Sequence, residues 1–354
     1  MSAIRSQNMR TLQRSKLVPR LLHEYGSIVR ADLRAYLPSK EPRRYLYNLL
    51  SDYPQRGGKM MRPALCIATA RAFGAPLEAA LGSAVAIELL HNALLIHDDI
   101  EDESEERRGR PTLHLLHGVP LALNAGDTLS LMSLRPLIDN ADLLGPEIAM
   151  RVLEEAELMA LESAEGQALE LGWRRENVTT VRVADYLKMV LKKTCWLGTI
   201  FPIRVGALIG TQDEADLDAF LRFGFFLGAT FQIHDDLLNL IGDDSYGKER
   251  DGDLWEGKRT LMLIHLLKNA GESDRLRILS ILSRPREERT SDQICWLRRL
   301  MDSCGSIAYA QRIAHRLASA ALNEYSIMFS WMPDSCDKRF LREIISWVMD
   351  RNSN

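Results

Sequence analysis

The sequence predicts an all-α protein that folds as one domain. Apolar residues recur at spacings of three and four along nearly all of its 354 residues, whereas the alternation typical of strands is almost absent. No linker rich in Gly and Ser, no shift in composition and no fixed-period repeat divides the chain. We therefore expect a single helical domain over residues 1–354, with residues 1–25 as a possible flexible, basic N-terminal extension.

Clusters of helix-breaking residues predict where the helices end. Glycine and proline gather with small polar residues between the apolar segments. The predicted breaks are 38–42, 53–58, 109–111, 144–146, 172–180, 210–216, 269–274, 283–292 and 332–338. The longest irregular stretch is 242–258, and a loop of that length inside a compact domain is usually functional. We expect it to act as a lid or a binding loop.

Charge and cysteine usage exclude several classes of protein. The net charge of −3 gives no reason to expect a nucleic-acid partner. The five cysteines are odd in number and lack CxxC spacing, so neither a disulfide framework nor a zinc site is predicted. A reducing compartment suits this usage, and we expect a cytoplasmic location. No run of 18 uninterrupted apolar residues occurs, so no transmembrane helix is predicted.

The N-terminus is basic: five basic residues precede the first acidic one, Glu24. A transit peptide is one explanation. The interpretation that we favour is an amphipathic first helix, with its apolar face formed by Leu12, Leu17, Leu21 and Leu22.

A run of carboxylates follows an apolar helix at HDDIEDESEERRGRP, 97–111. Residues three, four and seven apart share a helix face, which places Glu88, His91, Leu95, Asp98 and Asp102 on one stripe. Carboxylates crowded on one face repel each other unless a cation lies between them. A solvated helix end is the alternative explanation for one such cluster.

A second carboxylate cluster, FQIHDDLLN at 231–239, argues against a solvated helix end as the explanation for both clusters. Here Gln232, either Asp235 or Asp236, and Asn239 fall on one stripe. Two clusters of hard oxygen ligands, each directly behind an apolar helix, suit Mg²⁺, which binds one or two carboxylates together with water and phosphate oxygens.

Basic residues provide possible phosphate partners. Lysine and arginine are the usual ligands of phosphate oxygens, and a carboxylate–metal site with dispersed basic residues predicts diphosphate binding. The candidates are Lys59, Arg62, Arg107, Arg108, Lys193, Lys248 and Lys258. The segment GGKMMRP, 57–63, is not a nucleotide P-loop, because it lacks the GK[ST] ending and the strand–loop–helix context.

Taken together, GGKMMRP, ELLHNALLIHDDIEDESEERRGRP, KKT (192–194) and FQIHDDLLN followed by GKERDGDLWEGK closely resemble the motifs of trans-isoprenyl diphosphate synthases. Their order and spacing match over residues 45–265. The resemblance implies an isoprenoid-synthase-type helical bundle around a deep central cavity, usually homodimeric. It also implies Mg²⁺-dependent condensation of isopentenyl diphosphate with an allylic diphosphate, and a cluster of three Mg²⁺ ions.

The resemblance also implies roles for individual residues. Asp98, Asp102 and Asp235 would ligate Mg²⁺, with Asp99 in support. The allylic diphosphate would contact Arg107, Lys193, Thr194 and Lys258. The diphosphate of isopentenyl diphosphate would contact Lys59, Arg62, His91 and Arg108, and Gln232 and Lys248 would assist. The chain-length floor would be Leu90, Ala93 and Leu94, where the small Ala93 implies a C20 product, geranylgeranyl diphosphate, or a slightly longer one.

Two positions and the C-terminal segment depart from the family pattern. Asn239 replaces the third acid of the second motif, and Glu170 stands where Asp is common. The C-terminus, DRNSN, has no basic tail to close over the substrate.

Two other functions are weighed against chain elongation. A class I terpene cyclase shares the ionisation chemistry, but needs no second diphosphate site and would carry an Asn, Ser/Thr, Glu triad that 235–247 does not provide. A non-catalytic partner subunit of a heteromeric synthase would be expected to have lost one of the aspartate clusters, and this chain keeps both.

Overall fold

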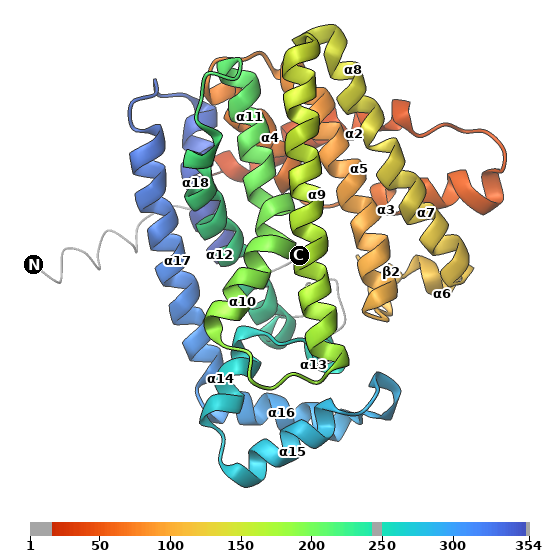
Figure 1. Cartoon of the computed structure of the whole chain (residues 1–354), viewed down its shortest axis with the longest axis vertical. Helices are drawn as coiled ribbons and strands as arrows, with labels where there is room; N and C mark the ends of the chain where they lie inside the picture. Colours follow the sequence, from red (N-terminus) through yellow and green to blue (C-terminus); the bar gives the residue numbers. More distant parts are fainter. Residues whose placement is uncertain (1–15, 243–249, 352–354) are drawn as a thin grey trace, which may run out of the picture.

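The structure, a computed structural model, describes residues 16–242 and 250–351 (Figure 1). Within these residues the protein is an assembly of helices, as the apolar periodicity predicts. The strands of the described part are β1 (Glu106–Arg107) and β2 (Arg110–Pro111), an antiparallel hairpin that pairs Arg107 with Arg110. Its turn residues, Arg108 and Gly109, both have positive φ, as a tight two-residue hairpin turn requires.

The first half of the chain forms the helices up to α9, and α5 among them carries the first aspartate motif. They are α2 (Leu17–Tyr36), the π-helical turn η1 (Arg43–Tyr47), α3 (Asn48–Gln55), α4 (Met61–Ala72), α5 (Leu77–Glu101), α6 (Leu113–His117), α7 (Val119–Met132), α8 (Leu134–Leu144) and α9 (Pro146–Arg175). The long helices α5 and α9 both run toward the end of the bundle at which the motifs lie (Figure 1).

The remaining helices carry the second motif and a small C-terminal layer. They are α10 (Val183–Val190), the π-helix η2 (Leu191–Ile200), α11 (Phe201–Thr211), the 3₁₀ turn η3 (Leu217–Ala219), α12 (Phe220–Ile241), α13 (Gly252–Glu256), α14 (Leu261–Asn269), α15 (Glu272–Leu282), the 3₁₀ turn η5 (Arg286–Glu288), α16 (Ser291–Ser303), α17 (Ser306–Phe329) and α18 (Cys336–Asp350). In Figure 1, α14, α15 and α16 form a separate layer at the foot of the bundle.

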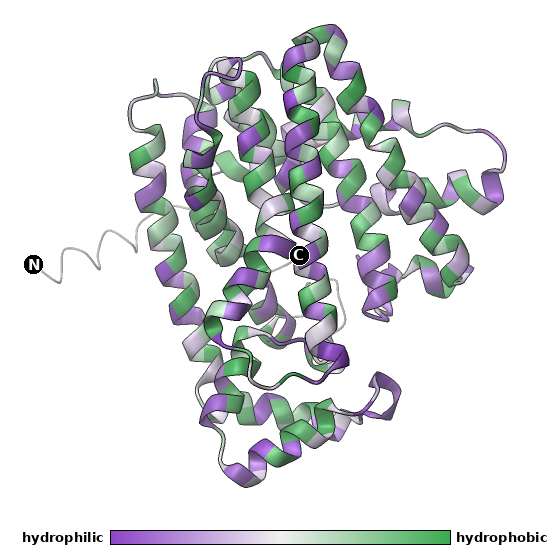
Figure 2. Ribbon diagram, viewed as in Figure 1, coloured by the Kyte–Doolittle hydropathy of each residue, from purple (hydrophilic) through white to green (hydrophobic). Residues whose placement is uncertain are grey.

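The core lies between α5 and its neighbours on one side and α12 on the other. Helix α5 packs against α4, α7 and α8, and α12 packs against α17 and η2. Apolar side chains alternate with polar ones around most helices (Figure 2), and the apolar faces meet inside. Helix α5 and the run Val183–Thr211 are long and apolar enough to span a membrane, but 67% and 83% of their most apolar windows are buried in this core.

The first helix corrects the expected N-terminal extension. Helix α2 begins at Leu17, and Val18, Leu21, Leu22 and Tyr25 are buried. The prediction of a flexible extension over 1–25 is therefore wrong for residues 17–25, because their apolar face packs into the core. The amphipathic interpretation holds for the part of this segment that the structure describes.

Most predicted breaks coincide with helix ends, with two kinds of difference. Helix α9 continues to Arg175, so residues 172–175 are helical, and α13 occupies Gly252–Glu256 inside the expected long loop. Breaks also occur where none was predicted, at 73–76, Gly118, Ser133 and 304–305. Gly118 and Ser133 are single turn residues between two helices and leave little signal in the periodicity, whereas the glycine and proline of FGAP at 73–76 were overlooked.

Candidate active site

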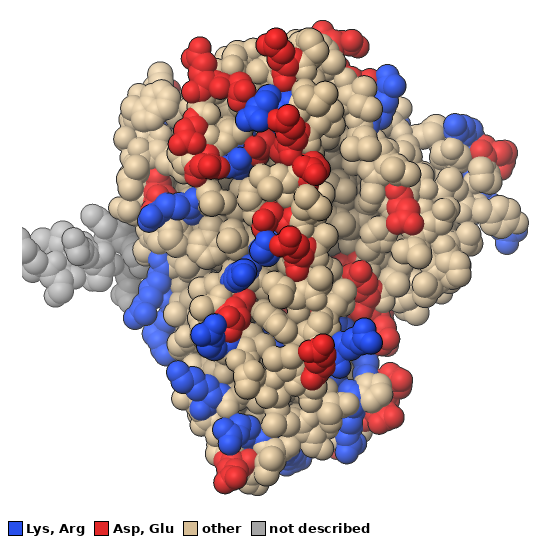
Figure 3. Space-filling view, in the orientation of Figure 1, with Lys and Arg blue, Asp and Glu red and all other residues tan. Residues whose placement is uncertain are grey.

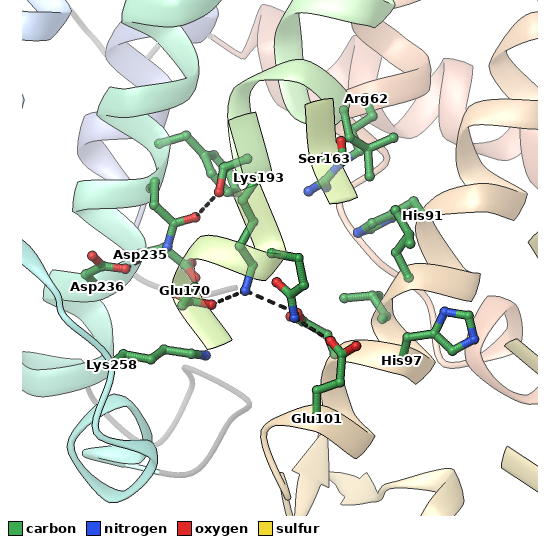
Figure 4. A pocket seen from close by; sticks show the side chains of 18 of the residues that line it. Arg62, His91, His97, Glu101, Ser163, Glu170, Lys193, Asp235, Asp236 and Lys258 are labelled. Carbon is green, nitrogen blue, oxygen red and sulfur yellow. Dashed lines mark hydrogen bonds and ion pairs between the residues drawn. The ribbon is translucent and has the colours of Figure 1, made fainter. Parts of the chain in front are cut away.

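A cavity of about 760 Å³ opens among α5, α9, η2 and α12, a size typical of substrate pockets. Figure 4 shows its two walls: His91, His97 and Glu101 project from α5, whereas Asp235 and Asp236 project from α12. Part of the cavity lining is apolar and includes Leu90, Leu94, Ala160, Ala164, Met189 and Leu197. Charged side chains gather at its mouth.

The first aspartate of α5 meets a lysine from the π-helix. Nζ of Lys193 lies 3.2 Å from Oδ1 of Asp98 and also binds Glu170 of α9 (Figure 4). Burial alone would raise the pKa of Asp98, but the positive charges of Lys193, Lys258 and Arg107 together outweigh it, and the pKa lies below its usual value. The same carboxylates hold the pKa of Lys193 above its usual value against the cost of burial.

Glycine at position 166 allows Lys193 to approach α9. A Cβ added to Gly166 would lie 2.1 Å from the backbone nitrogen of Lys193. Any larger residue would push η2 away from α9, because two backbones cannot approach this closely across a side chain. The position of the Lys193 ammonium therefore depends on Gly166.

The second aspartate of this stripe, Asp102, lies at the end of α5 and is 2% exposed. Its Oδ2 is 2.7 Å from Nζ of Lys258, and Arg174 donates to its other oxygen. These cations hold the pKa of Asp102 well below its usual range, although burial acts in the opposite direction. Lys258 also contacts Glu256 at 2.6 Å, and burial raises the pKa of that carboxyl to about 8.

Asp99 faces away from the cavity. It is completely buried, accepts hydrogen bonds from Nε (2.9 Å) and Nη2 of Arg107, and accepts another from the hydroxyl of Tyr53. Arg107 lines the cavity, yet in the structure its guanidinium is directed to Asp99. This pair fixes the hairpin that carries Arg107 and Arg108 against the end of α5.

Asp235 is the member of the second aspartate pair that meets a basic side chain. Nη2 of Arg351, the residue after α18, lies 3.3 Å from its Oδ1. Asp236 also lines the cavity but is bound by the hydroxyl of Tyr186 (2.8 Å) and Nε2 of Gln232 (2.6 Å). Burial raises the pKa of Asp236 to about 6.

Thr194 and Gln232 contact each other across the cavity wall. The Thr194 hydroxyl donates to Oε1 of Gln232 over 2.9 Å, while the amide nitrogen of Gln232 donates to Asp236. Both residues line the cavity, as the sequence predicts. Their bonds connect η2 to the second aspartate pair.

A second group of basic residues, Lys59, Arg62, His91 and Arg108, lines the cavity beside Glu88. Nε of Arg62 is buried without a hydrogen-bond partner among the described residues, and burial lowers its pKa to about 10. Burial and the nearby Arg62 lower the pKa of His91 to about 4, so the ring is neutral at pH 7. A buried cationic donor without a partner marks a place for an anion.

The outcome for two further residues differs from the prediction or stays open. Lys248 lies outside the described residues, so its predicted role stays a prediction. Asn239 is buried, and its Oδ1 accepts the backbone N–H of Asp253 over 3.0 Å. An amide that caps the start of α13 explains why this position tolerates the loss of a charge.

The predicted chain-length floor needs correction at Ala93. Leu90 and Leu94 line the cavity, but Ala93 is completely buried and does not. It lies one turn before His97, which is directed at Asp127 of α7. Helix α5 packs against α7, and the Ala93 side chain is enclosed by packing and does not reach the cavity.

Sequence reasoning overlooked Arg351, Arg174 and Tyr53 as members of the site, whereas it placed Glu88 on the correct helix face without giving it a role. The C-terminus lacks a basic tail and Arg351 had no predicted role, yet Arg351 lines the cavity. A lone arginine directly after the last helical turn has no motif around it. Only the packing of α18 against α4 and α12 brings it to the second aspartate pair.

The oxygen donors at the mouth suit Mg²⁺. Among the described residues no three carboxylates, histidines or cysteines lie close enough to hold an ion alone. Mg²⁺ commonly uses one or two carboxylates and takes its other ligands from substrate phosphates and water. Asp98 and Asp235, on opposite walls, fit that requirement, with Asp102 behind Asp98.

Known proteins resemble this chain over most of its length. The family profile described as polyprenyl synthetase matches residues 43–297. A short chain isoprenyl diphosphate synthase of Methanothermobacter thermautotrophicus is 37% identical over 73% of this chain and 77% of its own length. A geranylfarnesyl diphosphate synthase of Aeropyrum pernix is 33% identical over 83% and 91%. The crystal structure of geranylgeranyl pyrophosphate synthetase from Pyrococcus horikoshii Ot3 has a TM-score of 0.83 at 33% identity, covering 95% and 98%.

The helical fold, the apolar cavity and the facing aspartates define a prenyltransferase. The chain belongs to the polyprenyl synthetase family.

Asp98→Asn and Asp99→Asn are expected to have different effects, although the residues are adjacent. Asp99→Asn leaves the Arg107 guanidinium buried without a counter-charge and is expected to reduce the free energy of unfolding by about 3–5 kcal/mol. Asp98→Asn removes one carboxylate from a crowded group and is expected to change stability by less than about 1 kcal/mol while it abolishes activity. Urea unfolding followed by circular dichroism measures both. Equal losses of stability would contradict the separate roles.

Proposed function

We propose that this protein is a Mg²⁺-dependent synthase that joins isopentenyl diphosphate to an allylic diphosphate of five to fifteen carbons, with geranylgeranyl diphosphate as the main product and pyrophosphate as the other. The observation that carries the proposal is the mouth of the cavity, where aspartates from α5 and α12 alternate with buried lysines and arginines above an apolar channel.

The charged residues at the mouth determine how the reaction starts. Bound Mg²⁺ would supply positive charge to the diphosphate that leaves. Lys193 and Lys258 donate to the oxygens of the same group, and because they are buried their charge acts at full strength on the transition state. Breaking the C1–O bond leaves an allylic cation in the cavity.

The second basic group positions the other substrate. Arg62, Lys59 and Arg108 hold the diphosphate of isopentenyl diphosphate, and neutral His91 donates without adding charge. The double bond of this substrate attacks C1, and a new C–C bond forms. A proton then leaves for the released pyrophosphate, which restores a double bond and gives a chain five carbons longer. No protein nucleophile is needed.

The same group separates elongation from the alternatives. A cyclase uses one diphosphate and gives no reason for a buried Arg62 whose Nε has no hydrogen-bond partner among the described residues. A non-catalytic subunit would not need aspartates on both walls. Relatives named as short-chain and geranylfarnesyl synthases support elongation and leave the chain length to the cavity itself.

The cavity wall favours a long product. Ala160, Ala164 and Ala168 of α9 line it at four-residue spacing, on one face of the helix, across from Leu90 and Leu94. Small side chains on α9 leave room for a growing chain to descend. We therefore place the floor at Ala160 and its neighbours, and not at Ala93.

The reaction is tested with purified chain alone. Incubation with Mg²⁺, isopentenyl diphosphate and each of the C5, C10 and C15 allylic diphosphates is expected to release pyrophosphate and give a C20 product from all three, sized by chromatography. Chelation of Mg²⁺ is expected to stop the reaction. Pyrophosphate release from an allylic diphosphate alone, with a cyclic hydrocarbon, would indicate the cyclase. Silence without a second protein would indicate the partner subunit.

The floor is tested by Ala160→Phe, with Ala93→Phe as its control. The phenylalanine at 160 is expected to fill the channel and shift the product from C20 to C15. The one at 93 is expected to overpack the α5–α7 contact, lowering stability by about 1–3 kcal/mol without shortening the product of the folded enzyme. Product sizing and thermal unfolding of both variants check this. A shorter product from Ala93→Phe alone would return the floor to α5.

A homodimer is proposed from the surface of α6–α9. Exposed large apolar side chains concentrate there, and they are Leu115, Leu116, Val119, Leu123, Leu131, Leu134, Ile138, Leu143, Met150, Leu158 and Leu161. The surface between α9 and α7 carries few charges (Figure 3). An apolar area of this extent usually marks an interface, and a second copy of this chain would cover it.

Leu131→Glu tests the dimer, with Leu276→Glu of α15 as the matched control. The two leucines are 69% and 62% exposed, and only Leu131 lies on the apolar face. The first variant is expected to run as a monomer in size exclusion with light scattering, because the charge would be buried without a partner. The control is expected to stay dimeric like the wild type. A monomeric wild type at micromolar concentration would refute the interface.

A further inference from the structure

Arg351 lies outside every motif and yet reaches the mouth of the cavity. Its side chain is almost fully buried, and its guanidinium carbon lies 3.9 Å from the centre of the Phe231 ring. Nη2 donates to the carbonyl oxygen of Phe231 over 3.1 Å and lies 3.3 Å from Oδ1 of Asp235. The ring and the carbonyl position the guanidinium while leaving part of its donor fork directed at the carboxylate.

This contact repeats an arrangement found twice on the opposite wall. There, Asp98 is held by Lys193 at 3.2 Å and Asp102 by Lys258 at 2.7 Å. Both lysines are the groups that the proposed function assigns to the allylic diphosphate. Each aspartate that would bind Mg²⁺ is thus paired with a cation that can also bind phosphate oxygens. Asp235 follows the same pattern with Arg351.

Arg351 is also close to the second basic group. Burial lowers the pKa of Arg62, and the positive charge of Arg351 contributes to lowering it further. Both residues line the same cavity as Asp235. One small movement of the guanidinium would therefore exchange a carboxylate oxygen for an oxygen of a diphosphate bound between Arg351 and Arg62.

We propose that Arg351 is an exchangeable counter-ion of Asp235, which it holds until Mg²⁺ takes the carboxylate and a substrate diphosphate takes the guanidinium. This role rests on the proposed function. It makes the two ligands cooperative: Mg²⁺ alone must displace Arg351, and a diphosphate alone must draw Arg351 from Asp235, whereas the two together satisfy both side chains. By thermodynamic linkage, each ligand then strengthens binding of the other by the same factor.

The test is calorimetric titration of the substrate-free protein with Mg²⁺ alone and, in the presence of a chelator, with isopentenyl diphosphate alone. Arg351→Gln is expected to tighten Mg²⁺ binding several-fold, because the competing cation is gone. It is expected to weaken isopentenyl diphosphate binding by roughly tenfold, because one charged hydrogen bond to the diphosphate is lost. Asp235→Asn is expected to give the mirror image: weaker Mg²⁺ and tighter isopentenyl diphosphate.

Controls separate this role from a structural one. Arg339→Gln removes an exposed arginine of the same helix, α18, outside the cavity, and is expected to change neither affinity. Arg351→Lys keeps the charge and is expected to restore most of the diphosphate affinity. The proposal is supported if Arg351→Gln and Asp235→Asn each change the affinities for Mg²⁺ and for isopentenyl diphosphate in opposite directions. Changes in the same direction, or none, overturn it. A wild type that binds neither ligand would instead refute the proposed function.

Discussion

Asp98 and Asp235 line a cavity enclosed by helices, Asp102 lies buried near Asp98, and each of the three is paired with a basic side chain from another element. Lys193 comes from η2, Lys258 from the segment after α13 and Arg351 from the end of α18. Carboxylates that are this buried are costly without a counter-charge. The bundle must therefore bring five elements together at one end, and the close contact of α9 with η2 at Gly166 is one result.

Under the proposed function, the same charge balance would let one site bind both a metal and a diphosphate. Mg²⁺ is positive like the lysines and can take their place beside the aspartates. Phosphate oxygens are negative like the aspartates and can take their place beside the lysines. Binding of both ligands would therefore exchange ionic partners and leave little buried charge uncompensated. The buried pair of Asp99 and Arg107 differs from the other three, because its members are held by Tyr53 and the hairpin. In the proposed exchange it would keep the neighbouring groups in position.

Local sequence patterns were enough to predict the helices and most of the site residues. The positions that depend on tertiary packing could not be predicted in this way. Helical spacing was enough to place Glu88, His91 and Asp98 on one cavity face, because a rigid helix of 25 residues fixes which side chains point together. The rotation of that helix against α7 and α9 is not written in its own residues, so Ala93 was assigned to the wrong wall. Arg351 could not be found, because its place depends on a contact between α18 and α12, more than a hundred residues earlier.

A crystal structure of the protein with Mg²⁺ and an unreactive thio-analogue of the allylic diphosphate, together with isopentenyl diphosphate, tests the exchange of partners most directly. The account predicts that Nζ of Lys193 and of Lys258 lie within hydrogen-bond distance of phosphate oxygens, with Asp98, Asp102 and Asp235 turned to the metal and Arg351 more than about 4 Å from Asp235, beyond an ion pair. Diphosphates bound while the three aspartate–cation pairs stay intact would contradict it.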